Sequence, residues 1–398
     1  MNQRRRRGVA VGRPPSEPGD PSGVLQVSVW VGGLLVGISA AAFVWEWACV
    51  RATREFFREQ THPEDEMVDE RALPRASVLI PLRGSSCANQ DSIRSLLSQD
   101  YPLYDVIVGV EDSDIAAVQM LRRIQDEHRG DMLKFVAAPN ALGGRPKVGN
   151  LHNALALSCA ALLAMVDADV VVGPEFLRRF LSPLLNPEIG LTTCLYRADE
   201  GGGVWSRIDA LWTSTTYLPS ALFGRRVIGE TFAFGAAIGM RREVLDRIGG
   251  FAALNPRLGD DYQLGYRTAE MGFKVRFVPY VVTEHQDELS FRQLMDRRVR
   301  WCRTIRTFQG PGYAGSVITY GLPFAMAAAL LAPRSPKRWA WLIAVAANRV
   351  LCAGLNRACI EPNAPLMELC LIPLRDALGL AAWALGFTAP RRVRQVRH

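Results

Sequence analysis

The aspartates Asp167 and Asp169 are the strongest local signal for chemistry in this chain. They come directly after the apolar run 162–166, which has the length and composition of a buried strand. Two carboxylates at a strand end can hold a divalent cation, and a cation there can neutralise a diphosphate leaving group. A solvated acidic loop is the alternative explanation for this pair taken alone.

Polar residues also stand at two earlier positions that could bind the rest of a nucleotide. Asp112 follows the strand predicted at 105–110, where an acceptor could bind the imide N–H of a uracil, while Asp114 is expected to cap the next helix. The glycine-containing loop 143–147 ends in Lys147, and Asn150 follows it, so a cation and a polar side chain lie beside a flexible loop. A surface turn is the other interpretation of that loop.

A predicted general base and a group of basic residues lie farther along the chain. Asp261 stands just before a helical stretch, where a carboxylate could accept the proton of an acceptor hydroxyl, although capping of the helix by Asp260 is the plainer alternative. Arg297 and Arg300 are three positions apart on a predicted helix and could together bind a diphosphate, with Trp301 offering a ring to an acceptor or sugar. A basic helix resting on phospholipid would have the same pattern.

The elements that must position these residues alternate between strand and helix. Short β-rich runs are separated by segments with helical spacing, which predicts an α/β, doubly wound, mostly parallel sheet over residues 76–309. Such a sheet binds ligands at the carboxyl ends of its strands. The predicted strands are 76–81, 105–110, 133–137, 162–166 and 190–195, and the predicted helices are 91–99, 115–128, 148–157 and 174–185.

Membrane segments are predicted on both sides of this domain. Residues 23–45 carry no charge, and about 23 residues at about 1.5 Å each span a hydrocarbon layer of about 30 Å, so 23–50 is predicted to be a transmembrane helix. Residues 310–390 contain two to three further membrane helices, and the charged Arg349, Arg375 and Asp376 inside them leave an interfacial or re-entrant path open. A disordered basic arm (1–22), a linker (51–75) and a basic tail (391–398) complete the predicted organisation.

Composition excludes several classes of protein. The chain has 398 residues, of which 49% are hydrophobic and 22% charged, so most of it is not disordered. The net charge of +8 comes largely from arginines at the two ends, which favours an anionic lipid surface over a nucleic acid. The eight cysteines form no C-x-x-C pair and the five histidines no H-E-x-x-H motif, which predicts a reducing compartment and a metal held by carboxylates rather than a zinc site.

The order of these pieces resembles the ceramide glucosyltransferase-like branch, family 21, of the family 2 type glycosyltransferases, which have a GT-A fold. That branch has three separated aspartates followed by (Q/R)-x-x-R-W, and the resemblance runs from about residue 76 to 331. The positions that match the motif here are Asp112, Asp167 and Asp261, then Arg297, Arg300 and Trp301.

The resemblance implies inversion at the anomeric carbon of a UDP-sugar, with Mg²⁺ or Mn²⁺ as the cofactor. It implies Asp112 near uridine, Asp167 and Asp169 near the metal and diphosphate, and Asp261 as the base. Lys147, Asn150, Arg297 and Arg300 are then expected to bind the nucleotide sugar, with Trp301 on the acceptor side.

Several stretches, among them 192–198 and 232–239, look most similar to bacterial hopanoid-associated members, which are linked to N-acetylglucosamine transfer. The expected acceptor is thus a membrane lipid, ceramide or hopanoid. The chain ends differently from the W-R-G-x-x-Y-R-like tail that is common in the ceramide branch.

Two alternatives stay open at this point, a processive polysaccharide synthase and a non-catalytic lipid-binding protein that retains the fold. Five arginines on each side of the first membrane helix give no orientation by the positive-inside rule. The use of a cytosolic UDP-sugar is the reason to expect the domain on the cytosolic side of a bacterial inner membrane.

Overall fold

A computed structural model of the chain describes residues 21–59, 73–128, 131–199, 202–254, 259–331 and 337–388. Residues 1–20 of the predicted basic arm, 60–72 of the predicted linker and the whole predicted basic tail 391–398 lie outside the described residues.

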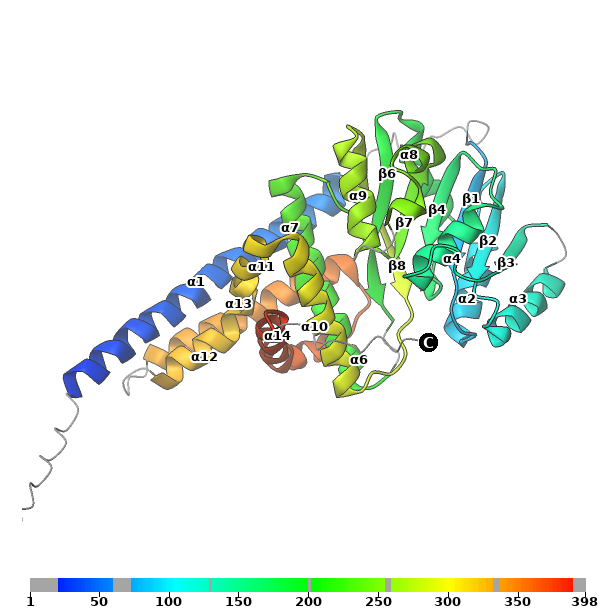
Figure 1. The fold of residues 1–398 in the computed structure, drawn as a ribbon. Coiled ribbons are helices and arrows are strands. Elements are labelled where there is room, and N and C mark those ends of the chain that lie inside the picture. The colour runs from blue at the N-terminus through cyan, green and yellow to red at the C-terminus, as the bar shows by residue number, and fades with distance from the viewer. Residues whose placement is uncertain are drawn as a thin grey trace, which may run out of the picture.

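The centre of the chain folds into an eight-stranded mixed sheet in the order β3-β2-β1-β4-β7-β6-β8-β5 (Figure 1). β1 to β4 pair in parallel, as predicted, because helical crossovers join them. The predicted doubly wound α/β class is therefore confirmed. The strands are β1 (Ala76–Pro81), β2 (Tyr104–Val110), β3 (Leu133–Ala137), β4 (Leu162–Val166), β5 (Val170–Val171), β6 (Ile189–Ala198), β7 (Ala237–Arg241) and β8 (Lys274–Glu284).

The antiparallel strand β7, between β4 and β6, was not predicted from the sequence. Its central residue is Gly239, and glycine weakens a strand pattern. Packing explains the glycine, since a Cβ at this position would lie 2.2 Å from Oγ1 of Thr192. Packing inside the sheet thus explains why β7 contains a glycine, a residue that made this strand hard to predict from the sequence.

Helices cover the sheet, and two of them begin at a residue whose side chain caps the helix. Asp114 caps α3, as expected, and accepts a hydrogen bond from the backbone N–H of Ala117. Ser86 caps α2 in the same way. The elements of this part are α2 (Cys87–Leu96), α3 (Ile115–Glu127), α4 (Pro146–Leu155), α5 (Phe176–Leu181), η3 (Ser182–Leu185), α8 (Arg242–Arg247), η5 (Phe251–Leu254) and α9 (Asp260–Glu270).

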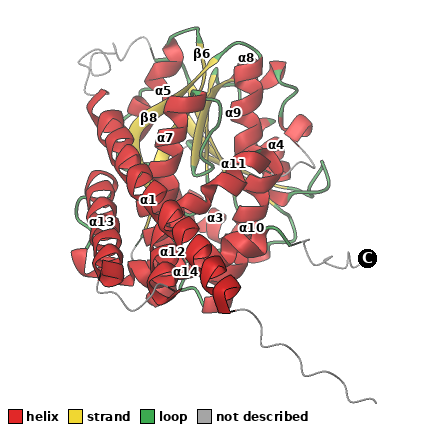
Figure 2. Ribbon diagram, turned by 90° about the vertical axis from the view of Figure 1, so that its left-hand side faces the viewer, coloured by secondary structure: helices red, strands yellow, loops and turns green. Residues whose placement is uncertain are grey.

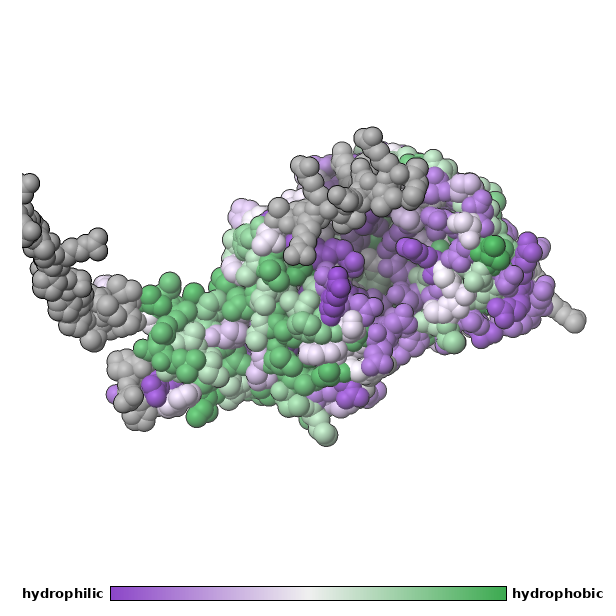
Figure 3. Space-filling model, turned by 60° about the horizontal axis from the view of Figure 1, so that its bottom comes forward, coloured by the Kyte–Doolittle hydropathy of each residue, from purple (hydrophilic) through white to green (hydrophobic). Residues whose placement is uncertain are grey.

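Four helical segments are long and apolar enough to cross a membrane, one near the N-terminus and three near the C-terminus. Large apolar side chains such as Trp30, Leu330 and Ile343 are at least 67% exposed on them, and Figure 3 shows the green surface that results. An apolar surface of this extent marks contact with lipid or another protein. The helices are α1 (Pro21–Glu59), α11 (Gly310–Gly315), η6 (Ser316–Tyr320), α12 (Gly321–Leu331), α13 (Lys337–Ile360), η7 (Leu366–Leu371) and α14 (Ile372–Gly386).

α1 extends to Glu59, well into the range that the sequence suggested as a linker. Two features favour the longer helix. Arg51 and Glu55 form an ion pair one turn apart, with Nε and Oε1 at 2.8 Å. Phe56 packs into the core of the sheet domain with 1% exposure. The end of the first span therefore belongs to the sheet domain.

Three further helices and one short turn lie between the sheet and the membrane spans (Figures 1 and 2). They are α6 (Val204–Trp212), the π-helical turn η4 (Thr213–Tyr217), α7 (Leu218–Ile228) and α10 (Phe291–Phe308). α7 packs against α1, where the rings of Phe223 and Trp45 are 4.6 Å apart. α10 packs against α14 and leads into the span that begins at Gly310.

Several charged residues inside the spans are buried in the helix bundle, among them Arg349, Arg375 and Asp376. Arg349 Nε lies 3.1 Å from Asp376 Oδ2 and 3.5 Å from Glu46 Oε1. Arg375 and Asp376 are fully buried. Pairing and burial within the bundle are how proteins keep such charges away from lipid. α13 and α14 accordingly continue as helices through these residues.

Candidate active site

Lys147 and Asp167 are brought together at the carboxyl edge of the sheet. Asp167 follows β4 directly, and Lys147 stands in the first turn of α4, which Pro146 begins. The Nζ of Lys147 lies 2.5 Å from Oδ1 of Asp167. Burial alone would lower the pKa of Lys147, but the charges of Asp167 and Asp260 raise it above its usual value. This lysine therefore stays protonated and can bind an anion.

The glycine loop before α4 delivers a second cation to the same edge. Gly143 and Gly144 have φ angles of +61° and +75°, in the left-handed region that favours glycine. The chain turns there, and Arg145 then places Nη1 2.8 Å from Oδ1 of Asp260. The loop thus connects the end of β4 with the start of α9, and a plain surface turn does not account for these two ion pairs.

Asp261 lies in the first turn of α9, beside Asp260. Its Oδ1 accepts a hydrogen bond from the N–H of Tyr262 at 2.8 Å. Its Oδ2 lies against Gly235, where a Cβ would approach it to 3.0 Å. Burial, and then the charge of Asp260, raise the pKa of Asp261 to about 6. A carboxylate with such a pKa is ionised at neutral pH and still accepts a proton readily.

Asp169 is held by the edge of the sheet. Its C=O accepts from the N–H of His285 at 2.8 Å, next to the pairing of Val170 with Glu284. Burial raises the pKa of Asp169 to about 7, and the negative charges of Glu284 and Asp167 add to the effect. Asp169 is thus crowded by two other carboxylates, an effect that the charge of Lys147 offsets only in part.

Asp167 and Asp169 fit a divalent cation whose coordination shell is completed by phosphate oxygens of the substrate. Among the described residues, no group of three or more His, Cys, Asp or Glu side chains is arranged as a metal cage. Mg²⁺ commonly takes only one or two protein carboxylates and completes its shell with water and phosphate oxygens. Asp167 and Asp169, which lie near Glu284, are two carboxylates of this kind.

α10 buries a stripe of residues spaced by four, Leu294, Arg298 and Cys302. Arg297 lies at the edge of that stripe, with Nη2 2.9 Å from Oε1 of Glu284. The side chain of Arg300 is exposed and makes no hydrogen bond or ion pair within the part of the chain that the structure describes.

Arg297 and Arg300 lie about 60° apart around the axis of α10, Arg297 at the edge of the buried stripe and Arg300 in solvent, and their joint binding of a diphosphate stays a prediction. Arg300 follows the buried Arg298 by two positions, a rotation of about 200° about the helix axis. The helix thus turns Arg300 away from the side that packs on the domain.

Aromatic rings line the side of the site that faces α6 to α7. Trp301 has its ring centroid 5.1 Å from that of Tyr217, which in turn lies 6.1 Å from Phe234 and 6.5 Å from Tyr196. We call these four residues the aromatic wall. The negative charge of Asp261 reaches Tyr217 and, after burial, is the next largest cause that raises its pKa. The aromatic wall therefore adjoins the predicted base.

Asp112 and Asn150 stand apart from this cluster. Asp112 follows β2, is exposed and makes no hydrogen bond or ion pair with any residue that the structure describes. Asn150 is only 2% exposed, and its Nδ2 donates to the C=O of Leu82 at 3.0 Å. Asn150 thus ties α4 to the residue that follows β1.

The comparison with protein families matches residues 33–394 to glycosyl transferase family 21. The chain belongs to this family. The resemblance inferred from the three aspartates and the Arg-x-x-Arg-Trp motif is thereby confirmed. The match covers the four membrane-compatible segments except residues 30–32 of the first.

Curated relatives of this family 21 protein are distant in sequence. It is 20% identical over 236 residues to ceramide glucosyltransferase 3 of Caenorhabditis elegans, over 59% of this chain and 51% of the relative. It is 24% identical over 249 residues to an N-acetylglucosaminyltransferase of Mesorhizobium japonicum, over 58% of this chain and 56% of the relative. The chain thus spans about half the length of these relatives.

A solved structure shares the fold of the family 21 protein. The mannosyltransferase PcManGT from Pyrobaculum calidifontis, in complex with GDP-mannose and Mn²⁺, matches 89% of this chain and 98% of its own with a TM-score of 0.52. The sequence identity is 18%, so the likeness concerns the fold alone. It confirms a GT-A-like glycosyltransferase fold.

Two acids that sequence reasoning missed, Asp209 and Glu284, lie beside Arg297 in the family 21 protein. Asp209 is fully buried, with Oδ1 2.5 Å from Nε of Arg298 and Oδ2 3.5 Å from Nε of Arg297. Glu284 ends β8 and pairs with Arg297 as described above. A single acid in the apolar helix that contains Asp209 could have been a signal, because a buried charge needs a partner.

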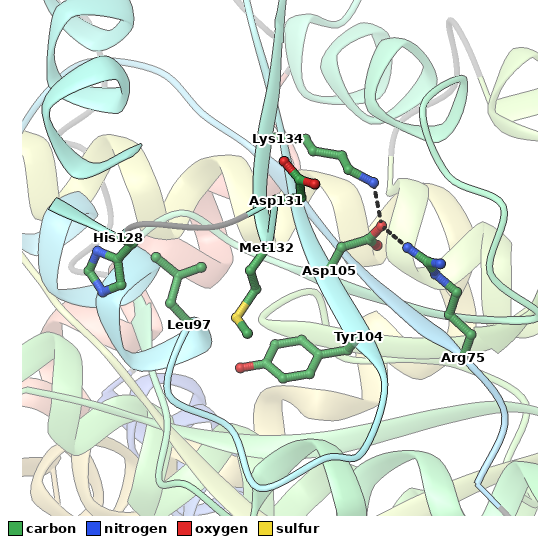
Figure 4. Close-up of a pocket in the computed structure, with 8 residues that line it drawn as sticks. All are labelled: Arg75, Leu97, Tyr104, Asp105, His128, Asp131, Met132 and Lys134. Atoms are coloured by element: carbon green, nitrogen blue, oxygen red, sulfur yellow. Dashed lines mark hydrogen bonds and ion pairs between the residues drawn. The ribbon is translucent and has the colours of Figure 1, made fainter. Parts of the chain in front are cut away.

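A cavity of about 700 Å³ lies at the opposite, amino-terminal edge of the sheet (Figure 4). Oδ2 of Asp105 in that cavity accepts from Arg75 and from Lys134, both at 2.9 Å, and Oδ1 accepts from Ser77. The carboxylate is thus already satisfied by a structural network. None of the predicted site residues lines this cavity.

Proposed function

We propose that this family 21 protein is an inverting glycosyltransferase that moves a hexose from a UDP-sugar to a hydroxyl group of a membrane lipid. The observation behind the proposal is the meeting of Lys147, Asp167, Asp169 and Asp261 at one edge of the sheet, beside the helices that lead into the membrane spans. A diphosphate leaving group needs the cations, and an acceptor hydroxyl needs the base.

The donor lies with its diphosphate beside Lys147 and its uracil toward Asp112. A bound Mg²⁺ or Mn²⁺, held by Asp167 and Asp169, supplies the charge that stabilises the leaving diphosphate. Arg297 is the second protein cation for this anion. To bind the diphosphate, it exchanges its present contact with Glu284 for phosphate oxygens.

Asp261 accepts the proton of the acceptor hydroxyl. The hydroxyl oxygen forms a bond to the anomeric carbon while the bond from that carbon to the diphosphate breaks, and the electron pair leaves with UDP. Attack from the side opposite the diphosphate inverts the anomeric configuration. Oδ2 of Asp261 is the atom suited to the proton, since Oδ1 already accepts from Tyr262.

The acceptor is a lipid, ceramide or hopanoid, and the sugar is glucose or N-acetylglucosamine. Three observations support a lipid. The aromatic wall adjoins Asp261, α10 ends at Phe308, and the next membrane span begins at Gly310. The names of the two curated relatives agree with either sugar. Use of a cytosolic donor puts the domain on the cytosolic side of a bacterial inner membrane.

Release of UDP by the full chain in detergent tests the proposal. UDP-glucose and UDP-N-acetylglucosamine are each offered with ceramide, with a hopanoid or with no lipid, and Asp261→Asn is the control. Lipid-dependent release that yields one glycolipid supports the proposal. A polymer formed without lipid would point to a processive synthase, and no release in any combination would refute it in favour of a non-catalytic lipid-binding protein.

A further inference from the structure

The π-helical turn η4 joins the membrane spans to the aromatic wall. It lies between α6 and α7, within one run of helix from Val204 to Ile228, and its last residue is Tyr217. A π-helical turn interrupts the regular backbone hydrogen bonding of a helix, and such turns are frequent at functional sites. The contacts of η4 therefore show what keeps Tyr217 in place.

Two arginines in different membrane spans donate to the same side chain of this turn. Nη2 of Arg349 lies 2.9 Å from Oγ1 of Thr216, and Nη2 of Arg375 lies 2.7 Å from the same oxygen. Arg375 also donates to Oγ1 of Thr215 at 3.2 Å. Arg349 is 2% exposed and Arg375 is fully buried. The Thr216 hydroxyl thus contacts both α13 and α14, and Thr215 adds longer contacts to the same two arginines.

Two carboxylates, Asp376 and Glu46, fix the direction of Arg349. Asp376 accepts from Nε of Arg349, and Glu46 of α1 lies on the same nitrogen at 3.5 Å. Apolar packing would hold a helix bundle at lower cost than buried charges do. What the charges add is a set of directed hydrogen bonds, and these end on η4.

The opposite end of the turn is attached to α10. Nη2 of Arg298 donates to the C=O of Asp209 at 2.7 Å and to Oγ1 of Thr213 at 3.3 Å. The guanidinium group of Arg298 also lies over the ring of Trp301, 5.2 Å from its centroid. η4 is therefore held from the membrane spans at Thr215 and Thr216 and from the site at Thr213, and Tyr217 packs on Trp301.

We infer that Arg349 and Arg375 are positioning residues for the acceptor side of the site. They act through Thr216, which fixes η4 so that the ring of Tyr217 stays against Trp301 beside Asp261. The membrane spans thus align the surface that receives the acceptor, in addition to anchoring the chain. This inference rests on the proposed function in so far as Trp301 lies on the acceptor side.

The test compares Thr216→Val with Thr216→Ser in the full chain in detergent. Valine keeps the shape of threonine but removes the hydroxyl that both arginines share, whereas serine keeps that hydroxyl. We expect valine to lower kcat/KM for the lipid on the order of tenfold or more, as for a lost hydrogen bond to a charged group, with UDP affinity by calorimetry within about twofold of wild type. Serine should restore kcat/KM. Equal lipid use by the valine and serine variants, or a parallel loss of UDP affinity, would overturn the inference.

Tyr217→Leu provides a second variant that leaves every buried arginine paired. This variant should show the same decrease in kcat/KM for the lipid while its UDP affinity stays at the wild-type value. Adding Thr216→Val to it should cause little further decrease. Normal lipid use by Tyr217→Leu would overturn the inference even if Thr216→Val does not fold.

Hydrogen exchange gives a readout that does not depend on transfer activity. Amides in residues 213–217 and 297–302 should exchange faster in Thr216→Val than in Thr216→Ser. If the wild-type protein transfers no sugar, the proposed function fails, while this comparison still decides whether the membrane spans position the aromatic wall. Unchanged exchange in 297–302 would refute the positioning.

Discussion

Replacing Asp261 by asparagine is expected to change activity and stability in opposite directions. Turnover should fall by about 10² to 10⁴, the effect of a lost general base, while UDP affinity stays close to wild type. Stability should rise, because the folded protein holds an ionised carboxylate at a place where burial and the charge of Asp260 disfavour it. Asparagine keeps the oxygen that accepts from Tyr262 and loses the charge.

The size of the stability gain follows from the pKa. Raising the pKa of Asp261 from 3.8 to about 6 on folding costs at most about 3 kcal/mol once the carboxyl is ionised in both states. Because the pKa is higher in the folded state, Asp261 lowers the free energy of unfolding of the wild type by the full amount above pH 6. Well below pH 3.8 the carboxyl is protonated in both states and has no such effect. The advantage of asparagine should therefore be complete at pH 8 and about half as large at pH 5.

Thermal unfolding of the full chain in detergent at pH 8 and at pH 5 measures this difference, beside UDP release at pH 8. Asp260→Asn is the matched control in the same turn. It loses the ion pair with Arg145 and keeps the base, so it should not be stabilised. It should also lower the pKa of Asp261 and shift the acidic limb of the pH–rate profile to lower pH. Turnover of Asp261→Asn within a few-fold of wild type, or a lower melting temperature at pH 8, would refute the reasoning.

Three other substitutions test the surroundings of the base. Asp169→Asn should remove most of the gain in UDP-sugar affinity that Mn²⁺ gives to the wild type in calorimetry after EDTA treatment, and an unchanged gain would contradict the metal assignment. Gly235→Ala places a Cβ 3.0 Å from Oδ2 of Asp261 and should lower kcat on the order of 10- to 100-fold at constant UDP affinity; a normal kcat would show that the carboxylate has room to move. Asp209→Asn leaves Arg298 buried without its carboxylate and should destabilise the protein by about 3 to 5 kcal/mol in chemical denaturation, so an unchanged midpoint would argue against this pair.

Features that depend on local spacing were predictable from the sequence. The runs around β1 to β4 alternate with helical segments, and an uncharged run of sufficient length marks a membrane span whatever surrounds it. Asp167 and Asp169 stand where a strand ends, and strand ends of a parallel sheet meet at one edge. The roles of Asp112 and Lys147 in donor binding stay predictions, as does the role of Asp261 as the base, which Asp261→Asn tests.

Contacts between distant segments were decided by the tertiary structure alone. Arg298 pairs with Asp209 across 89 residues, and no local pattern says which of the neighbouring arginines on α10 faces inward. The helical rotation put Arg298 in the buried stripe and Arg300 in solvent. The sequence already showed that Arg349, Arg375 and Asp376 are charged residues inside apolar segments, where charges are unusual. Their partners on η4 depend on how α13 and α14 pack, since a side chain's spacing along one helix does not specify what lies across from it.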